Sequence, residues 1–76
     1  MTRIDLGNRV RAARAFRRWS QGDLGEAAEA SVPTIVKIER GAETISLETL
    51  ERVCRTLDIP FEVLVDGQAL TQEAAA

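Results

Sequence analysis

The side chains with the clearest chemical use in this sequence are two cations, Lys37 and Arg40, in the stretch SVPTIVKIERG. If this stretch forms a helix, successive side chains lie ~100° apart around its axis, and the helix has two distinct sides. The inward side contains Ile35, Ile38 and Glu39, and the outward side contains Pro33, Val36, Lys37 and Arg40. The outward side therefore holds two cations and no acid, which suits contact with the phosphates of a nucleic acid.

Glu39 is the polar exception on the inward side, and a carboxylate beside isoleucines is costly unless it is paired. Arg14 is the best candidate partner, because it follows Val10 at i+4 on the edge of the apolar stripe of an earlier helix. We therefore predict a partly buried ion pair between Arg14 and Glu39 that fixes the two helices together. The sequence leaves open the alternative that each residue is an ordinary exposed charge.

The composition argues against most catalytic and metal-binding chemistry. The 76 residues include one cysteine and no histidine or tyrosine, so we expect no catalytic residue, no metal site, no cofactor and no internal disulfide. No apolar run approaches the roughly 20 residues of a membrane span, and no signal-peptide pattern is present. We therefore expect a single-domain cytoplasmic protein that is not an enzyme and makes no membrane contact.

Charge is distributed unevenly along the chain. The net charge of −2 argues against nucleic-acid binding when it is taken alone. However, residues 1–40 carry eight basic and five acidic side chains, whereas residues 41–76 carry two and seven. Such a chain can present a basic face to phosphate, although ordinary solvated charge explains the asymmetry equally well. The arginines between positions 9 and 18 could likewise bind phosphates or form an ordinary solvated helix face. For Arg11 and Arg18 we favour the solvated helix face.

The elements that would position these residues are all helices, because no strand pattern is present. We expect helices over about 5–18, over about 20–28, from Ser31 to Gly41, from Ser46, and from Phe61 to about Val65. A capping box at Ser20 and Asp23 begins the second, and Ser31 caps the third. Side chains expected in the core include Leu24, Ala27 and Ala28 of the second helix, Trp19 before it and Cys54 of the fourth.

Two short helices joined by two or three residues inside a helical domain form a helix-turn-helix. The segment from Leu6 to Gly67 resembles the XRE/Cro–phage repressor family of helix-turn-helix regulators. The matching motifs are the S-Q-x-x-L opening at Ser20, the I-E-R-G close at Gly41 and the S-L-E helix start at Ser46. The resemblance implies an all-α, compact five-helix, lambda-repressor-like DNA-binding domain. We assign it residues 1–67 and expect a flexible C-terminal tail over residues 68–76.

The resemblance also implies roles for individual residues. In this family, double-stranded DNA contacts the start of the second helix and the outward side of the third, which reads base edges in the major groove. The matching DNA-binding positions here are Gln21, toward the DNA backbone or an outer base, Ser31 and Arg40, toward the backbone, and Val32, Pro33, Thr34 and Lys37, toward the bases. The loop over residues 42–44 matches further backbone-contacting positions, and Arg14 and Glu39 match the family's buried pair.

Two departures from the family pattern affect the helix-turn-helix itself. Glu29 stands where the family usually has a glycine in the turn, and Gly25 stands where it usually has alanine early in the second helix. A non-glycine residue in a left-handed conformation costs about 1 kcal/mol, so we expect a reshaped turn. The reading helix is also poor in hydrogen-bonding groups, since Val32 and Pro33 have no side-chain donor. Phosphate contacts and DNA shape should therefore carry more of the recognition.

An apolar cluster near the C-terminus predicts self-association. Phe61, Val63 and Val65 cannot all turn inward from one short helix, so we expect a homodimer interface there, with a simple lid over the core as the alternative. We therefore predict a transcriptional regulator, a repressor or restriction–modification-type controller, that binds a near-palindromic operator as a homodimer. The alternative is an antitoxin-like or assembly module that holds a protein partner, and the salt dependence of DNA binding would separate the two.

Overall fold

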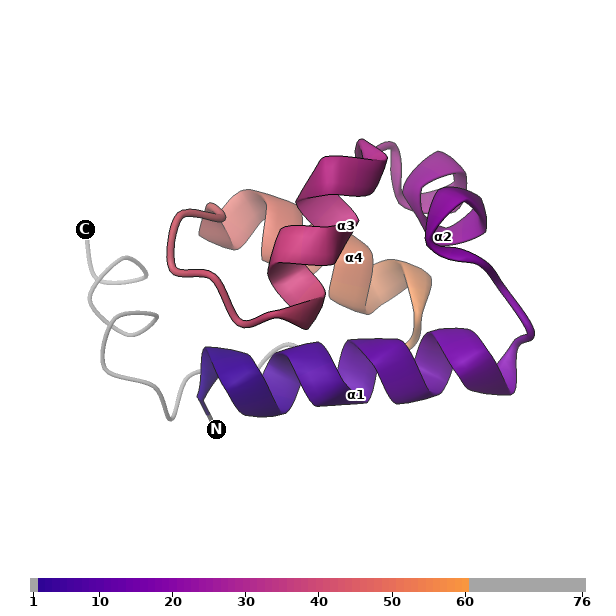
Figure 1. The fold of residues 1–76 in the computed structure, drawn as a ribbon, viewed down its shortest axis with the longest axis horizontal. Helices are drawn as coiled ribbons and strands as arrows, with labels where there is room; N and C mark the ends of the chain where they lie inside the picture. Colours follow the sequence, from indigo (N-terminus) through magenta and orange to yellow (C-terminus); the bar gives the residue numbers. More distant parts are fainter. Residues whose placement is uncertain (1, 61–76) are drawn as a thin grey trace.

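The structure, a computed structural model, describes residues 2–60, which form four α-helices and no strand. These are α1 (Arg3–Phe16), α2 (Gln21–Ala28), α3 (Val32–Glu39) and α4 (Leu47–Thr56). α2 and α3 lie on one side of the long α1, and α4 lies behind α3 (Figure 1). The all-α fold is confirmed for this part of the chain. The fifth helix, the C-terminal tail and the dimer residues Phe61, Val63 and Val65 lie outside the described residues.

Each of the four helices begins at a hydroxyl residue, because a side-chain oxygen there accepts a hydrogen bond from a backbone N–H of the first turn. The N-caps are Thr2, Ser20, Ser31 and Ser46. The capping box of Ser20 with Asp23 is present as predicted, with the hydroxyl 2.9 Å from the Asp23 nitrogen.

The first helix, expected over about 5–18, begins and ends two residues earlier. Thr2 and Asp5 form a second capping box, which starts α1 at Arg3. The hydrogen bond from the Thr2 backbone N–H lowers the pKa of the Asp5 carboxyl. α1 ends at Phe16, and Arg18 turns the chain with a left-handed φ of 58°.

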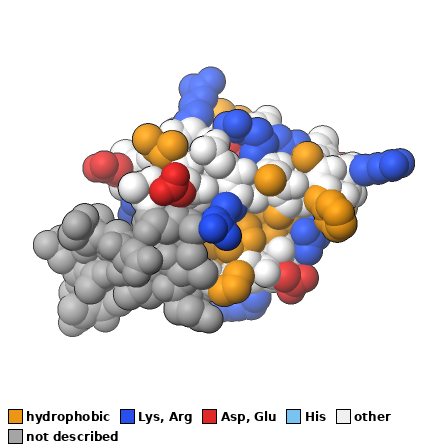
Figure 2. All heavy atoms as spheres, turned by 90° about the horizontal axis from the view of Figure 1, so that it is seen from below, with side chains coloured by type: hydrophobic (Ala, Val, Ile, Leu, Met, Phe, Trp, Pro, Cys, Tyr) orange, Lys and Arg blue, Asp and Glu red, His pale blue; other side chains and the backbone are white. Residues whose placement is uncertain are grey.

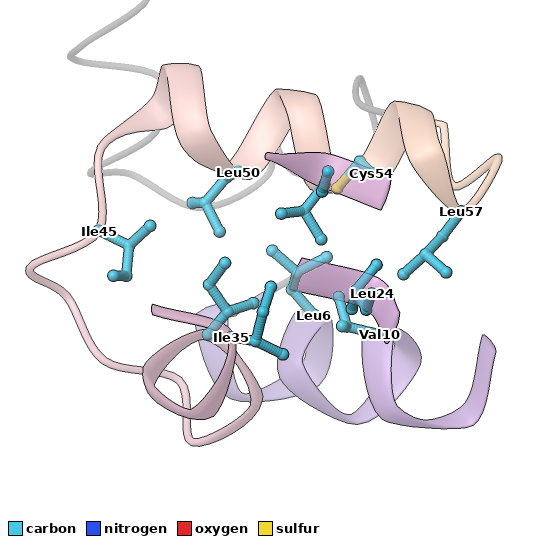
Figure 3. Close-up of a cluster of buried hydrophobic side chains, with 11 residues drawn as sticks. Leu6, Val10, Leu24, Ile35, Ile45, Leu50, Cys54 and Leu57 are labelled. Atoms are coloured by element: carbon cyan, nitrogen blue, oxygen red, sulfur yellow. The ribbon is translucent and has the colours of Figure 1, made fainter. Parts of the chain in front are cut away.

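The core lies where the inner faces of all four helices meet (Figure 3). Its buried side chains are Leu6, Val10, Leu24, Ala28, Ile35, Ile38, Ile45, Leu50, Val53, Cys54 and Leu57. Cys54 belongs to this cluster and Trp19 packs against it, so both are packing residues as predicted. Burial raises the pKa of the Cys54 thiol to about 11. Ala27 was assigned to the core wrongly: it is exposed, and Gly25 is buried in its place.

Two glycines let α3 approach α1 closely. A Cβ atom on Gly7 would lie 2.6 Å from the carbonyl oxygen of Ile38 and 2.7 Å from that of Glu39, so any larger residue would push the helices apart. Gly41 ends α3 with a left-handed φ of 78°, and a Cβ there would lie 2.9 Å from the Cα of Ile4. The last turn of α3 is thus seated directly on the α1 backbone.

Within residues 2–60, no helix has the length and hydrophobicity needed to cross a membrane. The same residues contain no group of three or more histidine, cysteine or acidic side chains that could hold a metal ion.

Candidate nucleic-acid interface

The orientation of α3 agrees with the two sides expected from its sequence, except that Val36, expected to face outward, is half-buried. Ile35 and Ile38 are buried, and Glu39 is only 5% exposed. On the opposite side, Lys37 and Arg40 are exposed, and neither forms an ion pair with a carboxylate anywhere in residues 2–60. Because the carboxylate of α3 is turned inward, the exposed surface of this helix carries only positive charge.

The N-terminal turn of α3 presents a small polar group beside two apolar side chains. The Ser31 hydroxyl accepts a hydrogen bond from the Thr34 N–H at 3.3 Å and lies 2.9 Å from the Thr34 hydroxyl. One of the two hydroxyl hydrogens is used between these residues, which leaves one donor for an outside partner. Pro33 is exposed and Val32 is 44% exposed, so both can contact apolar groups such as thymine methyls.

Glu39 is held by hydrogen bonds from two other helices. The Arg14 Nε donates to Glu39 Oε2 at 2.7 Å, and its Nη2 donates to Oε1 at 3.2 Å, in a bidentate arrangement. This hydrogen bond raises the pKa of Arg14. Arg14 also donates to the carbonyl of Trp19 at 2.9 Å, so it connects α1, the segment before α2, and α3.

Gln21 takes part in the same network. Its side-chain nitrogen donates to Glu39 Oε1 at 3.2 Å, so the side chain is directed toward α3. The residue still begins α2, where the first-turn N–H groups have no acceptor within the helix and favour an anion. In this conformation, the amide group of Gln21 is engaged within the fold.

The loop after α3 is anchored by Arg3, whose role was not predicted from the sequence. Its guanidinium donates to the carbonyl of Ile45 at 2.8 Å and to that of Ala42 at 3.5 Å. The loop contains exposed Glu43 and Thr44, so an exposed acid follows Arg40 closely in the sequence. No sequence signal identified Arg3, because it is separated from these carbonyls by about 40 residues.

The turn between α2 and α3 is also held by an arginine that was not predicted. The expectation of a reshaped turn was wrong: Glu29 itself adopts the left-handed conformation usual for glycine at this position, with φ 56° and ψ 45°. Arg52 of α4 donates from Nε to the carbonyl of Ala28 at 2.7 Å and from Nη2 to that of Glu29 at 3.3 Å. The two short helices are therefore fastened to α4 at the point where the chain reverses.

The basic cluster near the end of α1 is largely used within the fold. Arg17 forms an ion pair with Asp58 at 3.2 Å and lies 5.8 Å from the ring centre of Trp19. Arg11, expected to be simply solvated, is half exposed but donates to the carbonyl of Glu39 at 3.2 Å. The face of the molecule on the α1 side shows separated basic side chains with hydrophobic ones between them (Figure 2). In this view the described residues form no continuous basic surface.

Comparison with known proteins agrees with this geometry. Residues 5–66 match a family described as a helix-turn-helix domain. The chain is also 35% identical over 73 residues to the immunity repressor protein of Bacillus phage phi105. That alignment covers 96% of this chain and 51% of the phage protein, so the chain spans about half the length of this curated relative.

Proposed function

Since this chain belongs to the helix-turn-helix family of phage-repressor-like regulators, we propose that it binds operator DNA and regulates transcription, most simply as a repressor. The exposed side of α3 enters the major groove, and the start of α2 meets the flanking phosphates. In this proposal Val32, Pro33, Thr34 and Lys37 face the bases, while Gln21, Ser31 and Arg40 contact the DNA backbone.

The observation that carries this proposal is the inward burial of Glu39. The one carboxylate of α3 is neutralised by Arg14 inside the fold, and Lys37 and Arg40 remain outside without acidic partners among residues 2–60. A helix that only packed against the rest of its own domain would need no such separation of charge. A helix that lies against phosphates does need it, because an exposed carboxylate would repel them.

We further propose that the protein acts as a homodimer in the cytoplasm, through a domain over residues 1–67. In a two-fold dimer, equivalent recognition helices lie ~34 Å apart and contact successive turns of a near-palindromic site. The support for this step is the family's mode of binding and the apolar residues Phe61, Val63 and Val65 in the sequence. Light scattering at tens of micromolar protein, with and without DNA, tests it, and a strict monomer in both would contradict it.

Selection of bound duplexes from a random DNA pool tests the proposed function. We expect an enriched sequence, and the log of its binding constant should fall with the log of salt concentration by about 0.9 per phosphate neutralised. Lys37→Ala should remove discrimination at one base pair if the side chain reads a base, and Arg40→Ala should weaken all duplexes alike. No enrichment, or binding that is independent of salt, would contradict DNA binding and favour a protein partner instead.

A further inference from the structure

The turn between α2 and α3 has the geometry of a glycine-terminated helix without the glycine. The Ala30 N–H donates to the carbonyl of Gly25 at 2.8 Å, and the Glu29 N–H donates to that of Glu26 at 3.4 Å. These are the two hydrogen bonds of a Schellman motif, whose left-handed position is usually glycine. Here that position is Glu29, with φ 56°, so the motif is formed against a steric cost.

Gly25 is part of the same arrangement. A Cβ atom on Gly25 would lie 2.5 Å from the carbonyl oxygen of Ala30, closer than real Cβ contacts come. The turn therefore folds back over the bare backbone of α2, in space that an alanine side chain would fill. The two departures from the family pattern, at positions 25 and 29, are thus coupled through one loop.

Arg52 supplies two further hydrogen bonds to this loop. The Schellman bonds use the carbonyls of Gly25 and Glu26, and the carbonyl of Ala28 still needs a donor at the helix end. Arg52 Nε provides one at 2.7 Å, and its Nη2 reaches the carbonyl of Glu29 at 3.3 Å. The guanidinium charge also interacts favourably with the negative end of the α2 dipole.

This loop decides where the reading helix begins. Ala30 leads directly to Ser31, the N-cap of α3, and the proposed base-facing residues Val32 to Thr34 follow at once. A change in the turn would therefore tilt the first turn of α3. Glu39 lies at the other end of α3, so its ion pair with Arg14 does not restrain that first turn.

Given the DNA binding proposed above, we propose that Arg52 is a positioning residue for DNA recognition. Its hydrogen bonds hold the turn around Glu29 against α4, and so set the orientation of the N-terminal half of α3 relative to the rest of the domain. Arg52 touches no DNA in this arrangement. Its removal should weaken sequence-specific binding while leaving non-specific phosphate contacts in place.

The test compares Arg52→Met, which keeps the apolar stem but removes the donors, with Arg55→Met on the same helix. Arg55 is a matched control, because its exposed guanidinium contacts only Glu51, at 3.1 Å, within residues 2–60. Binding is measured to a duplex selected by the wild-type protein and to a scrambled duplex of equal length, at a temperature where circular dichroism shows folded protein. We expect Arg52→Met to bind the selected duplex about tenfold more weakly, with unchanged affinity for the scrambled duplex.

Rescue tests whether the loss of affinity arises at the turn. Glu29→Gly restores the residue that a left-handed turn prefers, so it should recover most of the selected-duplex affinity in the Arg52→Met background. Arg55→Met should match the wild type. Arg52→Lys, which keeps one donor, serves in place of the methionine variant if that variant does not fold, and should show a smaller loss.

Two results would overturn the role of Arg52. One is unchanged affinity for both duplexes. The other is equal loss on both with a salt slope lower by about 0.9, which would make Arg52 a phosphate contact. If the wild-type protein binds neither duplex, the proposed function fails. Hydrogen exchange at the Ala30 amide then tests separately whether Arg52 holds the turn in place. Faster exchange in Arg52→Met than in Arg55→Met supports the positioning role, and equal exchange rejects it.

Discussion

Replacing Glu39 with alanine removes a buried carboxylate on which side chains from α1 and α2 converge. The guanidinium of Arg14 then loses both of its bonds to the carboxylate, at 2.7 and 3.2 Å, while its side chain stays 18% exposed. Breaking a buried pair on one side costs about 3–5 kcal/mol, and the partial exposure of Arg14 favours the lower end. Gln21 also loses its acceptor, although its amide can turn toward water.

This cost is large for a domain of this size. At ~0.05–0.15 kcal/mol per residue, a chain of 76 residues is stable by roughly 4–11 kcal/mol. We therefore expect Glu39→Ala to lower the free energy of unfolding by about 3 kcal/mol in urea titrations, and Tm by roughly 12–24 °C. Removing both charges, in Arg14→Met with Glu39→Leu, should bring stability back to within about 1 kcal/mol of the wild type.

Glu51→Ala is the matched control. Its carboxylate pairs with Arg55 at 3.1 Å, but both side chains are largely exposed, so we expect a loss below about 0.5 kcal/mol. Equal losses of stability in Glu39→Ala and Glu51→Ala would contradict a special role for the buried pair. A double variant no more stable than Glu39→Ala alone would also contradict it, since the cost would then come from packing and not from an unpaired charge.

Three further predictions concern the scaffold. Gly25→Ala should destabilise the fold by about 1–3 kcal/mol, because the new Cβ meets the turn after α2. Gly22 is exposed on the same helix, so Gly22→Ala should stabilise the fold by about 0.5–1 kcal/mol. Thermal melts of the two variants measure both effects. Cys54, with its pKa raised from 9.0 to about 11, should hold about a hundredfold less thiolate than a free cysteine at pH 8. It should therefore react slowly with a disulfide reagent until urea is added, and rapid labelling of the folded protein would count against its burial. Asp5 has a lowered pKa, so the stability that it gives over Asp5→Asn should be present above pH 3.8 and disappear below it in acid titrations.

Helix positions and inner faces could be predicted because they depend on local signals. Hydroxyl caps mark the starts of α2, α3 and α4, and a 3.6-residue spacing separates the buried Ile35 and Ile38 from the exposed Lys37. The same angular reasoning placed Glu39 next to Arg14, which the structure shows in contact. α1 begins earlier than expected because Thr2 and Asp5 form a capping box before the apolar stripe starts.

The contacts of the long arginine side chains could not be predicted from the same signals. Arg3 and Arg52 bond to backbone carbonyls 42 and 24 residues away, and every residue has such a carbonyl. Helical periodicity says which way an arginine points, but not which carbonyl it reaches. For Gly25, the sequence showed an unusual residue, and only the position of the Ala30 carbonyl explains it.

The contact of α3 with DNA can be measured residue by residue by nuclear magnetic resonance, during titration of the folded protein with its selected duplex. We predict that the largest changes in amide chemical shift occur at Val32, Thr34 and Lys37, with smaller ones at the start of α2. The exposed positions of α4 around Glu51 should not change. Shifts that concentrate on α4 while the α3 amides stay fixed would contradict DNA recognition by α3.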